Sequence, residues 1–390
     1  MKAILTIPIL SLITFLFFTH CDQGPFPDDP VNIPDQSFLA ALLEPGLDEN
    51  GELQIIDSNG DGLISYAEAE AITYLDVSEL GIVDMTGIAK FIHLEVLLCQ
   101  NNQLTRLNVS RLPALEVLNC SNNKLISLDL SRNPEMKKLE CSHNLLFGLD
   151  LSLNSRVKDL DVSYNLLSFL DVSQHDSLQG FICAGNQLSD LDVSANAVLR
   201  SLDCSRNRLS ALDITGNPAL TSFDCSFNPI SSLDLSQNAL LEEFACDSCS
   251  LSELDLSNNR SLTTLSCALN QLESLDLTDN TALRYLSCFR NQLSTLEITA
   301  NSRLVDLYCS NNQLSSLHLV NKQYLRHLYC GYNQISSLNL SNNFNLWIVD
   351  VTGMPSLGEI CVWELPFPPE YILVNSGGSL NMYFTTTCSS

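Results

Sequence analysis

Residues 115–135 read LEVLNCSNNKLISLDLSRNPE, and residues 136–156 read MKKLECSHNLLFGLDLSLNSR. Leucines, a cysteine, asparagines and the tripeptide Leu-Asp-Leu return at the same places in both stretches. The unit L-x-x-L-x-C-S-x-N-Q-L-x-x-L-D-L-S-x-N-x-x occurs twelve times without insertion over residues 94–345, and a partial thirteenth begins at Leu346. A fixed period of this length predicts a solenoid, because a single coil cannot bury its own apolar face.

Each unit contains two short segments in which apolar and polar residues alternate. In the first, Leu97 and Cys99 should point inward and Leu98 outward, since successive side chains of a strand face opposite ways. The second, Leu128 to Leu130, has the same pattern. The expected fold is therefore a solenoid of strand and coil with two parallel β-sheets of short strands, whose neighbouring coils lie about 4.8 Å apart.

Two inward columns carry cysteine and asparagine. The asparagines are expected to satisfy backbone groups where the chain leaves each strand. The cysteines are interpreted as a ladder of buried thiols rather than as disulfides, which need a shorter spacing, or metal ligands, which must converge. Val162 and Val351 fill two slots of the cysteine column, Cys249 replaces one asparagine, and the cysteines are Cys99, Cys120, Cys141, Cys183, Cys204, Cys225, Cys246, Cys267, Cys288, Cys309 and Cys330.

This repeat resembles the leucine-rich-repeat superfamily, in particular its nested 21-residue variety called IRREKO, which is mostly bacterial. Residues 72–93 look like a divergent first repeat that caps the array, which itself spans residues 94–356. Together with the N-terminal features described next, the layout is similar to exported repeat proteins of the Bacteroidetes. The resemblance implies a location at the cell surface and does not imply a defined activity.

The N-terminus has the pattern of an export signal. Met1 and Lys2 precede an apolar run over residues 3–18 that is too short for a membrane span, and the signal is expected to end at Cys21. It resembles a bacterial lipoprotein signal, which implies lipidation of Cys21. Ordinary cleavage nearby and free secretion is the alternative. Residues 22–34, rich in Pro and Asp, are predicted to form an extended tether.

Residues 35–71 are expected to hold a short helix and a calcium loop. The twelve residues 57–68, DSNGDGLISYAE, match the EF-hand loop, and only oxygen atoms would bind the ion. An acidic turn that never fills is the alternative. The expected calcium ligands are Asp57, Asn59, Asp61, the backbone carbonyl of Leu63, Ser65 and Glu68. Residues 51–56 do not read as an entering helix, so a single stabilising loop of the dockerin-like kind, locking the cap onto the first repeat, is favoured over a sensor pair.

The outward positions of the two sheets differ in character. The second sheet repeats aspartate, for example Asp129, Asp150 and Asp171, which indicates either a solubilising surface or a cation-binding rail. The outward position of the first sheet varies and is free to serve a partner. Tyr and Arg are common anchors of interfaces, although an ordinary solvated face remains the alternative. The residues expected to bind the partner are Arg284, Tyr285, Tyr308, Arg326, His327 and Tyr329.

Residues 357–390 leave the repeat pattern and resemble the Cys-bounded terminal caps of such exported proteins. That resemblance implies a disulfide between Cys361 and Cys388, and an exported protein meets an oxidising environment.

The net charge of −26 argues against nucleic acid as a partner. The sequence contains no GxSxG, HExxH or Walker fingerprint, so no enzymatic activity is expected. The prediction is a calcium-stabilised, cell-surface or secreted protein, on the outer membrane if lipidated and attached to it only through that lipid. It would mediate protein–protein interaction or adhesion through the first-sheet face, as internalin-like proteins do. The alternatives are a glycan-binding accessory lipoprotein and an architectural envelope spacer, with a hydrolase in the C-terminal cap as the weakest.

Overall fold

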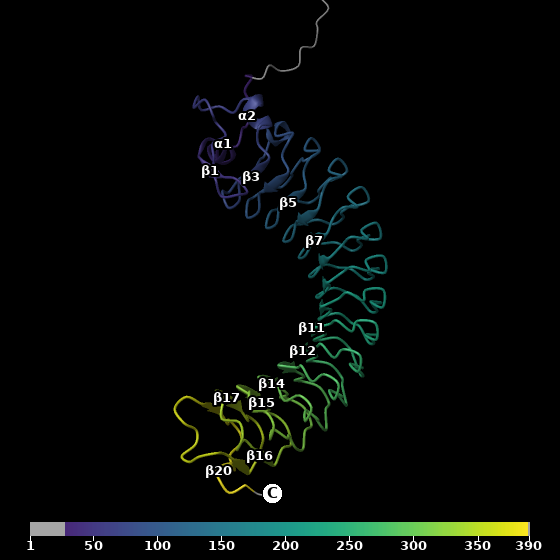
Figure 1. Ribbon diagram of the computed structural model, residues 1–390, viewed down its shortest axis with the longest axis vertical. Coiled ribbons are helices and arrows are strands. Elements are labelled where there is room, and N and C mark those ends of the chain that lie inside the picture. The colour runs from purple at the N-terminus through teal and green to yellow at the C-terminus, as the bar shows by residue number, and fades with distance from the viewer. Residues whose placement is uncertain (1–27, 389–390) are drawn as a thin grey trace, which may run out of the picture.

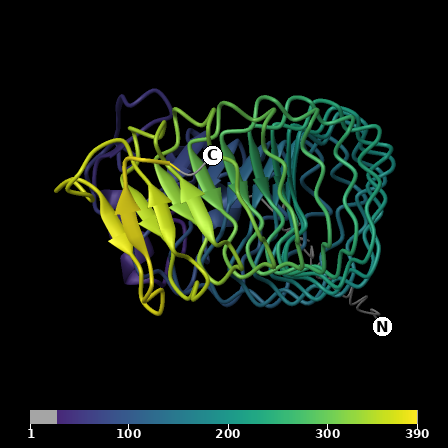
Figure 2. The same ribbon diagram turned by 90° about the horizontal axis from the view of Figure 1, so that it is seen from below.

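A computed structural model describes residues 28–388. The chain winds into a curved parallel solenoid whose concave side is lined by a single 15-stranded sheet (Figure 1). The view along the arc in Figure 2 shows the coils stacked one behind another. The strands of this sheet are β3 (Tyr74–Asp76), β4 (Val96–Leu98), β5 (Val117–Asn119), β6 (Lys138–Glu140), β7 (Asp159–Asp161), β8 (Gly180–Ile182), β9 (Ser201–Asp203), β10 (Ser222–Asp224), β11 (Glu243–Ala245), β12 (Thr264–Ser266), β13 (Tyr285–Ser287), β14 (Asp306–Tyr308), β15 (His327–Tyr329), β17 (Ile348–Asp350) and β19 (Leu373–Asn375).

The solenoid and its inward columns confirm the predicted fold class. Leu97 and Cys99 are fully buried, whereas Leu98 is half-buried on the outward side. Strand β3 pairs with β4, so residues 72–93 form the expected capping coil. The twelve cysteines of the described chain outside the disulfide are all free and buried. Burial raises the pKa of Cys120 to about 12, which keeps that thiol protonated and unreactive.

The first asparagine column performs the expected structural role. In Asn123 the carboxamide nitrogen donates to the carbonyl of Cys99 at 3.0 Å and to that of Cys120 at 3.0 Å. Its oxygen accepts from the N–H of Leu104 in the preceding coil at 2.9 Å. Asn123 thus joins two coils by two of these hydrogen bonds, and the third holds the turn of its own coil.

The second predicted sheet forms only at the C-terminal end. It contains three parallel strands, β16 (Ser337–Asn339), β18 (Glu359–Cys361) and β20 (Tyr383–Thr385). In the other coils the aspartate turns back on its own backbone, as Asp129 does when it accepts the N–H of Ser131 at 3.0 Å. Asn339 of β16 accepts the N–H of Ser341 in the same way, so this turn does not by itself prevent a sheet. The cause is the curvature, which separates the coils more on the convex side than on the concave side, where the sheet fixes their spacing.

A second asparagine column, whose role the sequence analysis did not recognise, holds the convex side instead. The side-chain nitrogen of Asn133 donates to the carbonyls of Val109 at 3.0 Å and Leu112 at 2.7 Å, both in the preceding coil. A side chain reaches across a spacing that backbone bonds cannot. His175 and Lys322 replace the asparagine in two coils, and both are fully buried.

The turn after each strand needs a left-handed residue. Asn122 has φ 55° and Phe227 has φ 58° at the same place of their coils, one residue before the first asparagine. Asn tolerates this conformation better than Phe. At Gly185 a Cβ would lie 2.7 Å from the ring of Tyr164, so a larger residue there would have to displace that ring.

Both ends of the array are closed by non-repeating structure. The N-terminal cap contains α1 (Gln36–Leu43), the two-residue strands β1 (Gly46–Leu47) and β2 (Leu53–Gln54), α2 (Tyr66–Glu70) and the 3₁₀ helix η1 (Ile88–Lys90). Asp35 caps α1 through the N–H of Phe38, and its other oxygen accepts the N–H groups of Val83 and Asp84 in the capping coil. This carboxylate therefore ties the helix to the solenoid.

Two predicted boundaries change. Val31 and Ile33 are buried, and the N–H of Val31 donates to the carbonyl of Ile64 at 2.7 Å, so the tether ends before residue 29 rather than at residue 34. Because Val31 and Ile33 stand at alternate positions, one side of this extended segment packs on the core. At the other end β19 continues the concave sheet, so residues 357–390 extend the solenoid as well as cap it.

Candidate functional site

The concave sheet presents two outward side chains on each strand. The central residue of the three faces the core, as Leu307 does in β14, and the flanking residues Asp306 and Tyr308 face outward. Because the strands pair in register, residues 21 apart stand side by side. The repeat therefore converts sequence columns into rows of neighbouring side chains.

Three tyrosines form a continuous stack on the concave face. The rings of Tyr308 and Tyr329 lie parallel with centroids 4.8 Å apart, and Tyr285 lies against Tyr308 at 5.5 Å with its ring tilted by 41°. Partial burial raises the pKa of Tyr285 and of Tyr308, so both hydroxyls stay protonated at neutral pH. The stack is a rigid apolar surface with hydroxyl groups at its edge.

Histidine and tryptophan extend this cluster. His327 Nδ1 forms a hydrogen bond with Asp306 Oδ1. The ring of Trp347 meets the ring of His327 edge-on at 5.9 Å, and the guanidinium of Arg326 lies 4.8 Å from the centroid of the Trp347 ring. These contacts hold each group in a fixed orientation before any partner arrives.

The six predicted partner-binding residues gather as expected, but on two adjoining surfaces. Tyr285, Tyr308, His327 and Tyr329 belong to the concave strands. Arg284 and Arg326 precede the strands and line a groove of about 530 Å³ at the sheet edge, together with residues the sequence analysis missed. The missed residues around the cluster are Arg303, Tyr324 and Trp347. A signal for Trp347 was present, because it stands 21 residues after Arg326 and 63 residues after Arg284.

The middle of the same concave face is acidic. Its outward positions include Glu140, Asp161, Asp203 and Asp224 in successive or neighbouring coils. Burial raises the pKa of Asp224. The concave face therefore has a polarity along the arc, acidic in its middle coils and aromatic with arginine towards the C-terminal end.

The predicted calcium loop lies beside the N-terminal cap and is well ordered by its own hydrogen bonds. Asp57 accepts the N–H groups of Gly60 at 2.8 Å and Gly62 at 3.0 Å, and Gly62 has the left-handed φ of 79° that the sharp turn requires. Ser65 caps α2 in a capping box with Glu68. Burial alone would raise the pKa of Glu68, but hydrogen bonds from Ser65 and Ser58 lower it to about 2.

The loop's donor chemistry suits calcium, since all six predicted ligand atoms are oxygens. Its arrangement meets the requirement only in part. Both oxygens of Glu68 accept hydrogen bonds, from Ser58 and from Ser65, and within residues 28–388 no three His, Cys, Asp or Glu side chains are grouped closely enough to hold a metal ion. To bind calcium, Glu68 must exchange these hydrogen bonds for the ion.

The convex aspartates have a local structural role. Hydrogen bonds from the N–H and hydroxyl of Ser131 lower the pKa of Asp129, and Ser152 lowers the pKa of Asp150 in the same way. The carboxylates are exposed and ionised. They shape the convex turns and give that side a negative charge.

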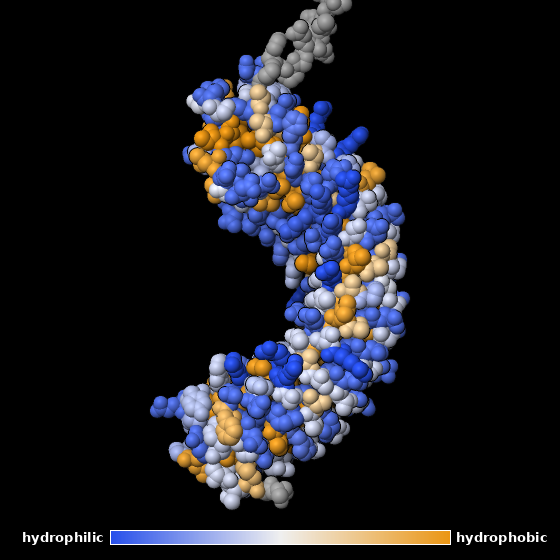
Figure 3. All heavy atoms as spheres, viewed as in Figure 1, coloured by the Kyte–Doolittle hydropathy of each residue, from blue (hydrophilic) through white to orange (hydrophobic). Residues whose placement is uncertain are grey.

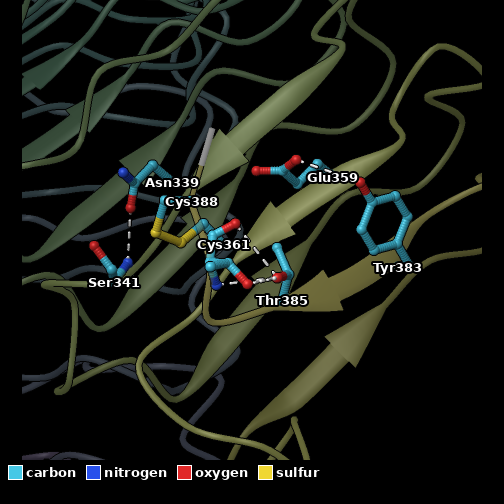
Figure 4. The surroundings of a disulfide bond; sticks show 8 residues. Asn339, Ser341, Glu359, Cys361, Tyr383, Thr385 and Cys388 are labelled. Carbon is cyan, nitrogen blue, oxygen red and sulfur yellow. Dashed lines mark hydrogen bonds between the residues drawn. A yellow bond between two sulfur atoms is a disulfide. The ribbon is translucent and has the colours of Figure 1, made fainter. Parts of the chain in front are cut away.

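The C-terminal cap contains the disulfide that the resemblance implied. Cys361 in β18 is bonded to Cys388, with Cα atoms 5.3 Å apart. In Figure 4 this disulfide lies with Asn339 of β16 on one side and Thr385 of β20 on the other. The bond joins strand β18 to the segment that follows β20, at the C-terminal end of the three-stranded sheet.

The predicted signal peptide and lipidation site lie outside the described residues. In the part of the chain that the structure covers, no helix is long and apolar enough to cross a membrane.

No protein-family model and no curated protein matches the sequence. Solved structures do match. The functional domain of InlJ from Listeria monocytogenes, which includes a cysteine ladder, is 32% identical, with a TM-score of 0.69 over 77% of this chain and 70% of that one. The internalin InlF from Listeria monocytogenes is 21% identical, with a TM-score of 0.74 over 82% of this chain and 96% of that one. YopM from Yersinia enterocolitica is 25% identical, with a TM-score of 0.65 over 81% and 70%.

Proposed function

The chain belongs to the leucine-rich-repeat family, and we propose that it is a non-enzymatic module whose concave face binds another protein. The tyrosine stack, Tyr285, Tyr308 and Tyr329, is the centre of the contact. It is the observation that carries the proposal, because these aromatic side chains stand at outward positions that the solenoid does not need to fill. Tyr and Arg are the residues that most often anchor protein interfaces.

The surroundings of the stack support a protein partner. Arg326 and His327 are held in place by Trp347 and Asp306, so little side-chain entropy is lost when they make contacts. The acidic middle coils would attract a basic part of the same partner and set its direction along the arc. A partner that spans both regions would meet charge and aromatic surface in a fixed order.

A sugar ligand is less well supported. Carbohydrate rings bind over the exposed face of an aromatic ring, whereas Tyr308 and Tyr329 cover one another at 4.8 Å and present mainly their edges. A glycan-binding role and an architectural spacer therefore remain as the two alternatives to be distinguished by experiment.

The experiment is a pull-down from the protein's natural surroundings with the mature chain. A variant with Tyr285→Ala, Tyr308→Ala and Tyr329→Ala should lose the partner. A matched variant with Tyr164→Ala, Tyr332→Ala and Tyr371→Ala, which removes three partly exposed tyrosines away from the stack, should keep it. A partner retained by both variants would place the site elsewhere, and no specific partner for any form would favour the spacer.

We also propose that the loop from Asp57 to Glu68 binds calcium and stabilises the N-terminal cap. The end of the loop is already joined to its surroundings: Tyr66 donates its N–H to Asp29 at 3.1 Å, and the Lys90 ammonium lies 4.5 Å from the ring centroid of Tyr66. An ion that orders the loop would therefore order the contact between α2 and the capping coil. Isothermal titration of the chelated protein with calcium tests binding directly, and Glu68→Gln should weaken it.

Export and lipidation at Cys21 complete the proposal, with the chain tethered to a membrane only through its lipid. The mass of the mature N-terminal peptide distinguishes a diacylglyceryl-cysteine from ordinary cleavage.

A further inference from the structure

Five exposed apolar side chains interrupt the repeat pattern over three successive coils. Figure 3 shows hydrophobic surface along the flank and outer side of the arc, over its middle coils. Phe147 is 68% exposed and Phe169 70%, while the buried leucines next in sequence to this group, such as Leu146, are fully covered. The apolar flank consists of Ile126, Leu145, Phe147, Leu166 and Phe169.

The solenoid itself does not require these residues. The position of Leu145 and Leu166 is glutamine in most other coils, for example Gln187 and Gln271, and the position of Phe147 is serine at Ser189. Single exposed apolar residues are normal on a protein surface, but a contiguous group in neighbouring coils indicates an interaction site. Packing within the solenoid therefore does not explain these apolar residues, whereas binding of a partner does.

The two phenylalanines border a groove with an acidic edge. The groove has a volume of about 520 Å³, and Asp150, Asp171 and His175 also line it. Hydrogen bonds from Ser173 lower the pKa of Asp171, so the carboxylate is ionised at neutral pH. Burial lowers the pKa of His175, which leaves the imidazole neutral. The groove is apolar in its walls and negative at its edge.

The negative charge of the chain indicates which kind of molecule binds the groove. The chain has 45 acidic and 19 basic residues and a net charge of −26, so a second copy would bring like charge against this face. An anionic lipid surface would be repelled for the same reason. A polypeptide segment with large apolar side chains and flanking Lys or Arg complements both the walls and the edge.

We propose that the apolar flank is a second docking surface, which takes a short, basic amphipathic segment of another polypeptide. The three coils span at least roughly 10 Å, because the spacing of neighbouring strands on the concave side is the lower limit, and this length corresponds to two or more turns of an α-helix. Two or three apolar side chains from one face of that helix would fill the groove, and basic residues beside them would meet Asp150 and Asp171. The surface lies away from the concave tyrosine stack and functions whether or not that stack binds a partner.

The test uses model peptides and fluorescence anisotropy. The probe is an 18-residue peptide of leucine and lysine, with the leucines on one face of a helix, and its counterpart carries glutamate in place of lysine. The wild-type chain should bind the lysine peptide and should bind the glutamate peptide at least tenfold more weakly. Equal binding of the two peptides would overturn the choice of a basic partner.

Two variants locate the binding. Phe147→Ser with Phe169→Ser should weaken binding of the lysine peptide about tenfold or more. The matched control, Val198→Ser with Leu240→Ser, replaces two exposed apolar residues outside the flank and should leave binding unchanged. Unchanged affinity of the phenylalanine variant would overturn the site. Asp150→Asn with Asp171→Asn tests the charge argument without changing the apolar surface. The variant should fold, because Asn108 and Asn339 occupy the equivalent position in other coils and each accepts the N–H of a serine. This variant should also bind more weakly, and equal binding would contradict the charge argument.

Two further measurements exclude the other occupants. In sedimentation velocity the wild-type chain and the Phe147→Ser, Phe169→Ser variant should have the same oligomeric state. A wild-type dimer that is lost in the variant would show that a second copy of the chain occupies the flank. Co-sedimentation with phosphatidylglycerol vesicles should likewise be absent, since binding that requires Phe147 and Phe169 would make the flank a membrane-contact surface.

Discussion

Replacing Cys249 by asparagine should stabilise the solenoid, which is unusual for a change at a buried position. In the neighbouring coils Asn228 and Asn270 each accept a leucine N–H and donate to two carbonyls. Cys249 offers only a weak thiol hydrogen bond, at 3.5 Å to the carbonyl of Cys225. It has no carboxamide oxygen for the N–H of Ile230, which occupies the place of the donating leucines. The coil with Cys249 is therefore joined to its neighbour less strongly than the others.

The expected gain follows from the bonds restored. Cys249→Asn adds an acceptor for Ile230 and donors to the carbonyls of Cys225 and Cys246, and each such bond contributes about 0.5–1.5 kcal/mol net. After the cost of desolvating the amide and losing the thiol contact, we expect unfolding to require about 2 kcal/mol more. Urea denaturation followed by circular dichroism measures this, and the midpoint should rise at an unchanged m-value.

Two control substitutions separate hydrogen bonding from the loss of the thiol. Cys249→Ser should recover part of the gain, and Cys249→Ala should be less stable than the wild type. The reasoning fails if the asparagine variant is no more stable than the wild type, or if alanine stabilises as much as asparagine.

Three further predictions concern groups elsewhere in the chain. Chelation should lower the melting temperature of the calcium-loaded protein in differential scanning calorimetry, and Glu68→Gln should abolish most of that response; an unchanged melting temperature would disprove the structural role of calcium. Burial lowers the pKa of Lys322 from 10.5 to about 8, so the unfolded chain binds more protons between these pH values and stability should rise with pH in that window. Lys322→Asn, the residue of the neighbouring coils, should remove this slope and add up to about 3 kcal/mol below pH 8, as measured by urea unfolding at each pH. The eleven buried thiols of the cysteine column should react with a thiol reagent only as fast as the solenoid opens, because burial raises the pKa of those such as Cys183; rapid reaction in the native state would contradict the buried ladder.

Most of the fold was predictable because the same pattern of buried and exposed positions occurs in every repeat. A period of 21 residues fixes the coil, and the alternation around Leu97 fixes which side chains are buried. The cysteine and asparagine columns follow from the same alignment. One coil alone would be ambiguous, but twelve copies leave little freedom in the register, since a shift of one residue would expose every core leucine.

The candidate sites were predictable to a smaller extent. The tyrosines and arginines near the C-terminal end do gather, because residues 21 apart become neighbours. Their division between the concave strands and the groove at the sheet edge depends on the direction of each side chain at the strand entrance, which the repeat pattern does not specify. The apolar flank was missed because Phe147 and Phe169 occupy variable positions, and only their exposed fractions show that they are not core.

The solenoid, its inward columns and its alternating outward faces follow from the amino-acid sequence, because they depend on local periodicity and burial. The confinement of the second sheet to β16, β18 and β20 does not follow from the repeat and appears only in the folded chain. Curvature spreads the convex side beyond the reach of backbone hydrogen bonds. Side chains such as Asn133 reach across the wider spacing instead. Curvature is a property of the whole stack, so no single repeat contains it.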